Sequence, residues 1–205
     1  MTAPPPVYRT ARGPLPRLAE PFARRARARR YARFAEIVAP NPTMRIVDVG
    51  CGALGLRGLA PGLDVTGVDL VERPGYPGPF VRADASAGLP FADGEFDLAY
   101  CSSVIEHVPP ARRAAFAAEL RRVARGWYVQ TPARSFPIEP HSLLPGAHWL
   151  APALRRHYWR LGASGAWEDL ALLRRAELEA LFGPADAERF GPLVKSWVSV
   201  RRPRH

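Results

Sequence analysis

An apolar stretch at residues 46–55 runs directly into closely spaced glycines, in the order Ile-Val-Asp-Val-Gly-Cys-Gly-Ala-Leu-Gly. Because Gly50 and Gly52 lack a Cβ atom, the backbone can turn sharply there and approach a ligand closely. Asp48 and Cys51 lie directly beside them. The pattern G-x-G-x-x-G is also the fingerprint of dinucleotide-binding proteins and is weak on its own. Its meaning depends on the residues that come after it in the chain.

Two carboxylates lie at the ends of the next two apolar stretches. Residues 63–69 end in Asp69, about twenty residues after the glycine loop, where one acidic group can accept hydrogen bonds from both hydroxyls of a ribose. Residues 80–82 lead to Asp84, whose carboxylate can accept a hydrogen bond from an adenine amino group. These residues predict a site for an adenosine-containing cofactor.

A later segment supplies histidines. His141 follows Ile138 and Glu139, and the segment 131–149 comes directly after a predicted strand, so we expect it to reach the cofactor loops. Since imidazole titrates near neutral pH, His141 is the candidate general base for activating a hydroxyl group of a substrate. Packing or capping within the loop is the alternative role of His141. The pair Glu106-His107 is interpreted as packing and local hydrogen bonding.

The elements that must position these residues alternate between strands and helices. Strands are predicted at 45–49, 64–69, 79–82, 96–101 and 126–130, helices at 20–38, 111–125 and 168–182, and a hairpin over 187–202 that turns at Gly191-Pro192. The strands are short, apolar and bounded by Gly, Pro or Asp, as buried parallel strands usually are. The pattern predicts an α/β fold, a Rossmann-like doubly wound, mostly parallel seven-stranded sheet with a C-terminal antiparallel hairpin.

We expect residues 1–205 to form a single domain. Prolines predict an irregular arm over 1–18, followed by the basic helix 20–38. Residues 131–167 are rich in proline and aromatic residues and are expected to form a lid over the acceptor site. The aromatic candidates for the walls of that site, or for a small buried cluster, are Phe136, Trp149, Tyr158, Trp159 and Trp167.

Composition limits the class of protein. The chain is 47% hydrophobic and 23% charged, which is ordinary for a globular domain. No apolar run reaches the ~18–20 residues that span a bilayer, and the N-terminus lacks the apolar core of a signal peptide, so we expect a cytoplasmic protein without a membrane partner. Cys51 and Cys101 alone make neither a disulfide framework nor a four-ligand zinc site, and no metal is predicted. No residue pattern indicates an oligomeric state.

The net charge of +10 raises the question of nucleic-acid binding. Only Lys195 among the 29 basic residues is a lysine, and together with abundant Ala, Gly and Pro this is typical of a GC-rich genome. Nucleic acid is therefore disfavoured as a partner without being excluded. The arginines of the basic helix could face phosphates, close over a cofactor carboxylate, attract an anionic acceptor or form a solvated face: Arg24, Arg25, Arg27, Arg29, Arg30 and Arg33.

At four places in order, the chain resembles class I methyltransferases that use S-adenosylmethionine (SAM), particularly the small-molecule, type 11-like group. The matching stretches are Val47–Gly52, Val68-Asp69, Ala83-Asp84, and Phe96-Asp97 with Glu106-His107. The resemblance implies that SAM is the cofactor and that its binding residues are Asp48, Gly50, Cys51, Gly52, Asp69, Leu70, Asp84, Ala85, Cys101 and Ser102. One departure is that Gly55 comes one position later than the third glycine of many members.

The resemblance implies methyl transfer to a small-molecule acceptor, with a hydroxyl in secondary-metabolite or glycan tailoring favoured by family analogy alone. Residues 100–103, Tyr-Cys-Ser-Ser, replace the Asn-Pro-Pro-Tyr run of nucleic-acid amino methyltransferases. Three alternatives stay open: an RNA methyltransferase that uses the basic helix, a catalytically silent SAM-binding module, and, more faintly, a nicotinamide-dependent oxidoreductase.

Overall fold

The computed structural model describes residues 14–139, 141–162 and 170–203, with the side chains of 14–24 and 26 left out. Seven strands form one sheet in the order β3-β2-β1-β4-β5-β7-β6. Their bounds are β1 Arg45–Val49, β2 Asp64–Asp69, β3 Phe80–Arg82, β4 Phe96–Ser102, β5 Ala124–Pro132, β6 Ala185–Phe190 and β7 Leu193–Arg201. The first five strands are parallel, whereas β7 is antiparallel to both β5 and β6. The predicted fold class is confirmed.

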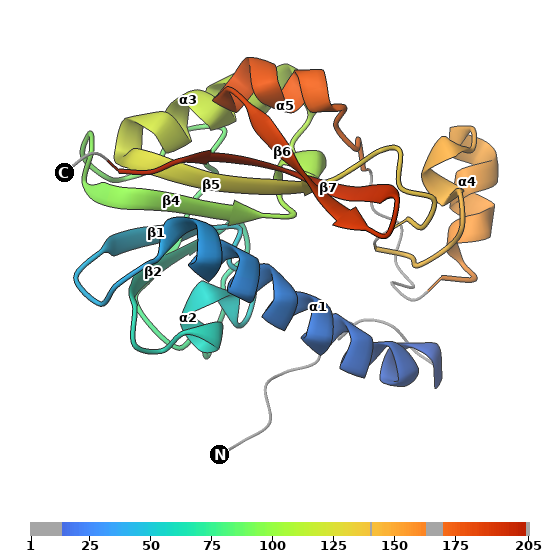
Figure 1. Cartoon of the computed structure of the whole chain (residues 1–205), viewed down its shortest axis with the longest axis horizontal. Helices are drawn as coiled ribbons and strands as arrows, with labels where there is room; N and C mark the ends of the chain where they lie inside the picture. The colour runs from blue at the N-terminus through green and yellow to red at the C-terminus, as the bar shows by residue number, and fades with distance from the viewer. Residues whose placement is uncertain (1–13, 140, 163–169, 204–205) are drawn as a thin grey trace.

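Helices cover both faces of the sheet (Figure 1). On one face α3, Arg113–Val123, and α5, Arg175–Phe182, bury residues such as Phe116 and Leu178 against the strands. On the other face lie α1, Pro14–Val38, and α2, Gly55–Leu59. Among the described residues no helix combines the length and apolarity that crossing a membrane requires.

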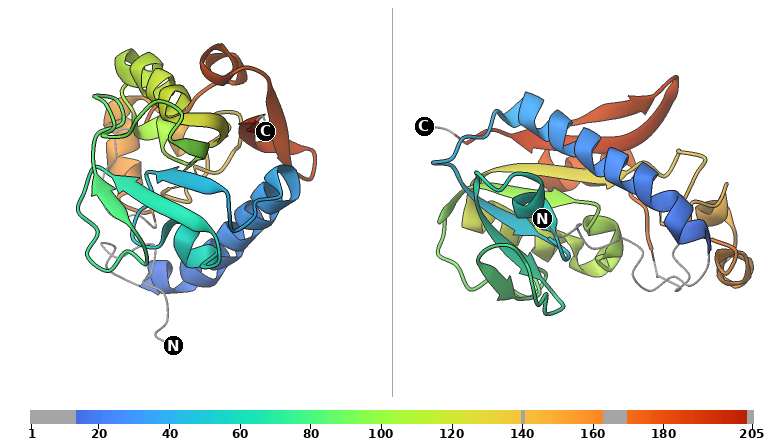
Figure 2. Two further views of the ribbon diagram at one scale, coloured as in Figure 1. Left: turned by 90° about the vertical axis from the view of Figure 1, so that its left-hand side faces the viewer. Right: turned by 90° about the horizontal axis from the view of Figure 1, so that it is seen from below.

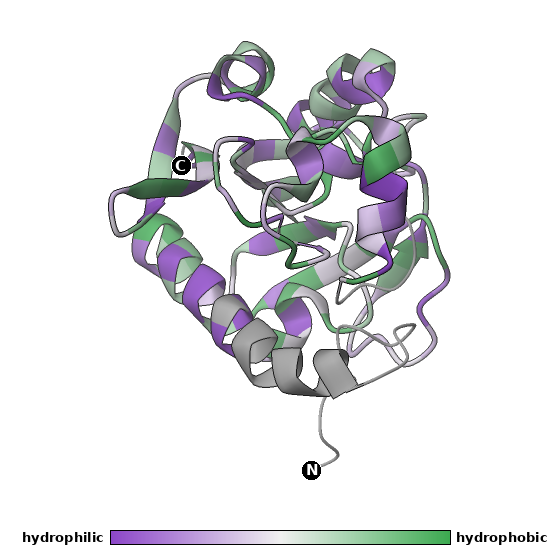
Figure 3. Ribbon diagram, turned by 90° about the vertical axis from the view of Figure 1, so that its right-hand side faces the viewer, coloured by the Kyte–Doolittle hydropathy of each residue, from purple (hydrophilic) through white to green (hydrophobic). Residues whose placement is uncertain are grey.

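Helix α1 crosses the sheet diagonally, as the view from below shows (Figure 2). Its buried Phe34 ring packs edge-on against Tyr100 of β4 and Tyr128 of β5, at centroid distances of 5.0 and 5.2 Å. In Figure 3 hydrophobic and hydrophilic residues alternate along the coloured part of the helix, which fits an element with one face on the sheet.

The predicted irregular arm over 1–18 is wrong for residues 14–18, because α1 already begins at Pro14. Pro14 and Pro16 lie in the first turn, where the N–H that proline lacks has no partner within the helix. Residues 1–13 of the predicted arm lie outside the described residues.

The predicted helix 168–182 is shorter than expected, because α5 begins only at Arg175 and residues 170–174 have no regular structure. Two tertiary hydrogen bonds hold this segment: the N–H of Ala171 donates to the carbonyl of Glu106 at 3.0 Å, and Arg113 donates to the carbonyl of Ala171. Residues 168 and 169 lie outside the described residues. The buried side chains of the described segment are Leu170, Leu172 and Leu173.

The predicted lid segment begins within the end of β5 and contains short elements. Ile138 bridges to Pro145, a 3-10 turn spans Ala147–Trp149, and α4 spans Pro152–Trp159. Figure 1 shows α4 beyond the end of the sheet toward which β4 and β5 point. The segment thus starts from the edge of the sheet that carries the glycine loop.

Candidate functional site

The glycine loop after β1 depends on backbone angles that favour glycine. Gly50, Gly52 and Gly55 have φ angles of 75°, 62° and 58°. A Cβ atom at Gly50 would lie 2.3 Å from a methyl group of Val104, and one at Gly55 would lie 2.6 Å from Oδ2 of Asp48. Among the described residues nothing lies within 4 Å of a Cβ built at Gly52. Gly55, the third glycine, therefore lies in a well-defined turn, although it comes one position later in the sequence than the third glycine of many similar proteins. Gly52 borders open space.

Asp48 is buried at the end of β1. Its Oδ2 accepts a hydrogen bond from the backbone N–H of Leu56 at 2.6 Å. Burial raises the pKa of Asp48 to about 7, with the Leu56 hydrogen bond acting in the opposite direction and the negative charge of Asp69 adding to the increase. The side chain of Asp48 thus holds the glycine loop in place.

Asp69, at the end of β2, faces the same loop. Its Oδ2 accepts hydrogen bonds from the N–H of Gly52 at 3.0 Å and from Nε of Arg73 at 2.9 Å, and its Oδ1 accepts one from the N–H of Val71 at 3.0 Å. The next two side chains, Leu70 and Val71, are 64% and 57% exposed. A carboxylate and an exposed apolar surface thus lie together beside the glycine loop.

Asp84, just after β3, stabilises its own turn. Its Oδ1 accepts hydrogen bonds from the N–H and Oγ of Ser86 at 2.8 and 2.7 Å, and Oδ2 lies 3.5 Å from Nη1 of Arg112. The hydrogen bonds from Ser86 lower the pKa of Asp84, which outweighs the effect of partial burial. Ala85 is buried beside it. This edge of the sheet therefore keeps an ionised carboxylate.

Both predicted cofactor-site cysteines, Cys51 and Cys101, are buried. Burial raises the pKa of each thiol well above its usual range. Since the thiolate is the nucleophilic form, neither cysteine is suited to nucleophilic catalysis. They act as small apolar side chains.

A chain of hydrogen bonds joins α1 to the ends of β4 and β5. Ser102 and Ser103 donate from Oγ to Oε1 of Gln130 at 2.8 and 3.2 Å. Nη1 of Arg30 donates to Oγ of Ser103 at 3.1 Å. One arginine of the predicted basic stripe is therefore directed toward the sheet edge that carries the glycine loop.

The predicted base, His141, is held by a buried carboxylate. Oε1 of Glu139 lies 2.8 Å from Nδ1 of His141, and Oε2 accepts hydrogen bonds from the backbone N–H of His141 and from Ser142. Burial opposes ionisation of Glu139, but the hydrogen bonds from His141 and Ser142 outweigh it and lower its pKa. With Nδ1–H donated to Glu139, Nε2 carries the lone pair of the neutral ring.

Glu106 and His107 lie against this imidazole. They belong to a 3-10 turn at Ile105–His107, directly after β4. Oε2 of Glu106 accepts a hydrogen bond from Thr131 at 3.1 Å, and Oε1 lies 4.0 Å from Nε2 of His141. The rings of His107 and His141 meet edge to face at 4.9 Å. The pair that sequence patterns assigned to packing is thus in contact with the candidate base.

The pKa values of Glu106 and His107 are both shifted by their surroundings. Burial raises the pKa of Glu106, although His141 and Thr131 act against the increase. Desolvation lowers the pKa of His107 to about 4, and the nearby His141 adds to the decrease. His107 is therefore neutral near pH 7.

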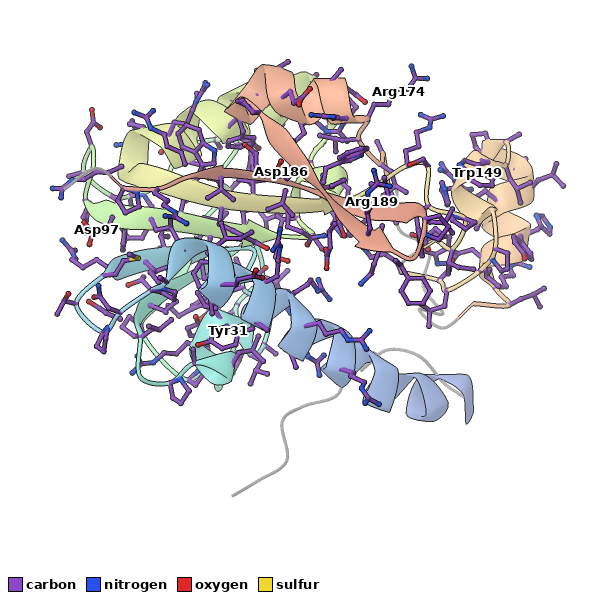
Figure 4. The ribbon with its side chains drawn as sticks, viewed as in Figure 1. Tyr31, Asp97, Trp149, Arg174, Asp186 and Arg189 are labelled. Atoms are coloured by element: carbon purple, nitrogen blue, oxygen red, sulfur yellow. The ribbon has the colours of Figure 1, made fainter. Side chains whose placement is uncertain are left out.

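Other residues from the sequence motifs lie elsewhere. Asp97 accepts a hydrogen bond from the N–H of Arg45 at 2.9 Å and joins the beginnings of β1 and β4. In Figure 4, Asp97 is at the opposite end of the molecule from Trp149. Of the predicted aromatic wall, Trp159 is buried, Trp149 is 55% exposed and Trp167 lies outside the described residues.

Residues 47–126 match the methyltransferase-domain family Methyltransf_11. A ubiquinone biosynthesis O-methyltransferase of Aromatoleum aromaticum is 32% identical over 126 residues, which cover 55% of this chain and 53% of that protein. The chain thus spans about half the length of this curated relative.

Two solved structures share the fold. The PH0226 protein of Pyrococcus horikoshii superposes with a TM-score of 0.61 at 18% identity, covering 88% of this chain and 91% of that one. The Burkholderia thailandensis 1,6-didemethyltoxoflavin-N1-methyltransferase, solved with S-adenosylhomocysteine, gives 0.55 at 17% identity, covering 85% and 76%. With the strand order, these similarities show that the chain has the fold of these structures, and residues 47–126 are similar to the methyltransferase-domain family.

Proposed function

We propose that the chain transfers the methyl group of SAM to a hydroxyl oxygen of a small-molecule acceptor, and that His141 activates this hydroxyl. The observation that carries the proposal is the Glu139–His141 pair beside the end of β4, with Nδ1 held at 2.8 Å and Nε2 directed toward Glu106. An imidazole oriented by a carboxylate is a common arrangement for general-base catalysis. The O-methyltransferase named for the Aromatoleum relative supports an oxygen acceptor.

The cofactor residues of this proposal are those expected from the sequence. Asp69 takes the ribose hydroxyls, and its present bond to Arg73 is exchanged when the ribose binds. Leu70 offers apolar surface beside the adenine, which Asp84 and the backbone of Ala85 recognise. The remaining contacts come from the glycine loop and the end of β4, that is from Asp48 through its support of the loop and from Gly50, Cys51, Gly52, Cys101 and Ser102.

The reaction needs little machinery beyond alignment. As the new C–O bond forms, the bond between the methyl carbon and the sulfur breaks, and S-adenosylhomocysteine leaves. The hydroxyl proton passes to Nε2 of His141. Holding the two reactants in line is the main contribution of the protein, and a positioned base adds about 10²–10⁴-fold.

Cofactor binding is tested by calorimetric titration with SAM and, separately, with NAD. We expect SAM to bind, NAD not to bind, and Asp69→Ala to weaken SAM binding. Asp64→Ala, at the exposed beginning of the same strand, is the matched control and retains affinity. Preferential binding of NAD would overturn the assignment of the glycine loop.

Catalysis is tested with a panel of phenols, catechols and sugar hydroxyls. We expect methyl ethers as products, and His141→Gln should lower kcat about 10²–10⁴-fold without changing SAM affinity. His157→Gln, on exposed α4, is the control. Tight SAM binding without turnover on the whole panel would support the silent module instead, and full activity of His141→Gln would remove His141 from the mechanism.

A further inference from the structure

Glu106, His107 and His141 bring together potential metal ligands from two segments of the chain. One ligand atom from each residue lies within 4.8 Å of those of the other two. Glu106 and His107 follow β4, whereas His141 follows β5, and the hydrogen bond from Thr131 to Glu106 ties the two segments together. Two imidazoles and one carboxylate are a ligand set that Zn²⁺ and neighbouring divalent cations take in catalytic sites.

The buried carboxylate of Glu106 is only half satisfied. Among the described residues no group donates a hydrogen bond to its Oε1, although the side chain is fully buried. A buried polar atom without a partner costs about 1–3 kcal/mol, and more when it is charged. This oxygen lies 4.0 Å from Nε2 of His141. A cation between these two atoms would satisfy the carboxylate.

Glu139 supplies what a metal-binding histidine needs behind it. Ligating histidines usually donate their second N–H to a carboxylate or carbonyl, which fixes the tautomer and the ring orientation. The 2.8 Å contact between Glu139 and Nδ1 of His141 is of this kind and leaves Nε2 as the ligand atom.

We propose that Glu106, His107 and His141 bind one first-row divalent cation, with Zn²⁺ as the best fit to the ligand set. Bonds of ~2.0–2.2 Å would bring tetrahedral ligand atoms to about 3.4 Å from one another. The pair Glu106–His141 is already close to this separation. His107, which is exposed, would close the remaining distance by rotation of its side chain.

The cation deepens the proposed function, and this part rests on it. Three protein ligands leave coordination positions for the acceptor, and an oxygen bound to a divalent cation loses its proton more readily. With Nε2 bound to the cation, His141 cannot itself take the proton, so in the metal-loaded chain the direct transfer to Nε2 is replaced by loss of the proton from the metal-bound oxygen to solvent. Acceptors with a second oxygen next to the reacting hydroxyl, such as catechols or vicinal diols, would bind through both oxygens.

Metal binding is tested without reference to activity. The full chain is freed of metal with EDTA, transferred to chelator-free buffer and titrated with ZnCl₂, MnCl₂ and MgCl₂ by calorimetry. We expect one Zn²⁺ per chain and much weaker Mg²⁺ binding. Glu139→Gln should weaken Zn²⁺ about 10–100-fold, and Glu106→Gln and His141→Ala should weaken it further. His157→Ala is the control with an unchanged affinity.

Thermal melts and SAM titrations of each variant report whether it is folded. Absent Zn²⁺ binding, or binding that Glu106→Gln and His157→Ala change equally, would overturn the proposal and show adventitious binding. Stoichiometric Zn²⁺ without any methyl transfer would leave the cation site standing and remove the proposed function. Methyl transfer that EDTA does not affect, in a chain that binds no Zn²⁺, would remove the cation site and leave the proposed function standing.

Discussion

The glycines of the loop after β1 share a positive φ angle but meet different surroundings. Gly50 and Gly55 are packed against neighbouring side chains, so a methyl group there requires the loop to move. Gly52 has open space at the same position, and its N–H donates to Asp69. Substitution at Gly52 therefore separates the cost in backbone strain from the cost in ligand binding.

We predict that Gly52→Ala lowers the free energy of unfolding by roughly 1–2 kcal/mol, the cost of a left-handed conformation for a residue with a Cβ, and weakens SAM binding by about tenfold or more. Gly191→Ala is the matched control, because Gly191 also has a positive φ, 58°, and open space but lies in the turn between β6 and β7. It should lose similar stability and keep its affinity for SAM. Denaturant unfolding and calorimetry measure the two effects, and unchanged SAM binding by Gly52→Ala would place the cofactor elsewhere.

The raised pKa of Asp48 leads us to predict that its contribution to the stability of the chain falls as the pH rises toward 7. Its pKa is raised from 3.8 to about 7 in the folded chain, mainly by burial, so the folded state holds the proton more tightly than the unfolded state. Its contribution to stability is complete below pH 3.8 and is lost as the pH rises to about 7. At 1.36 kcal/mol per pKa unit, the loss is at most about 4 kcal/mol.

Asp48→Asn removes this titration and keeps an oxygen that can accept the hydrogen bond from Leu56. The variant should therefore gain stability relative to the natural chain as the pH rises from about 4 to about 7. Urea unfolding of both proteins at several pH values measures the difference, in which the titration of other carboxylates cancels. A difference that is constant with pH would show that folding does not raise the pKa of Asp48.

At the scale of elements, α1 is attached to the sheet chiefly through Phe34. The ring is fully buried and contacts Tyr100 and Tyr128. We predict that Phe34→Ala costs about 3–5 kcal/mol of stability, whereas Phe190→Ala, at a 61% exposed position in β6, costs little. Thermal or urea unfolding compares the two. Equal losses would mean that α1 contributes little to the stability of the sheet.

The sequence was most informative where local pattern and tertiary role agree. The bounds predicted for β1 and β2 match the structure, because each is an apolar run ended by a carboxylate or glycine. The apolar residues before α5 suggested helix, yet hydrogen bonds to Glu106 and Arg113 hold the segment at Ala171 in a non-helical conformation. Such contacts join residues far apart in the chain and leave no local signal.

At the scale of the whole molecule, the contacts around His141 also join residues far apart in the chain and leave little local signal in the sequence. Glu106 and His141 are 35 positions apart and meet only because β4 and β5 are neighbours in the sheet. A sequence signal did exist, because the polar pair Glu106-His107 interrupts the apolar residues Val104, Ile105 and Val108, and the fold buries Glu106 there. His141 was found from its residue type, whereas the support from Glu139 needed the fold.

Net charge is the other property of the whole molecule, and it bears on RNA as an acceptor. The net charge of +10 already subtracts the carboxylates, and some arginines are neutralised locally: Arg33 pairs with Glu36, and Arg122 pairs with Glu119 and Asp93. Arg30 is directed to Ser103. The basic face left on α1 by these contacts includes the exposed Arg25 and Arg29.

We therefore predict only non-specific RNA binding, with a Kd of about 10⁻⁶–10⁻⁴ M at physiological salt that weakens steeply as salt rises. The double substitution Arg25→Gln and Arg29→Gln should reduce the salt dependence and leave SAM affinity unchanged, since neither arginine is among the proposed cofactor residues. Fluorescence anisotropy with labelled RNA at several salt concentrations measures both effects. Tight, sequence-selective binding that the double substitution abolishes would instead make RNA the acceptor, because counterion release from phosphates cannot by itself distinguish one sequence from another.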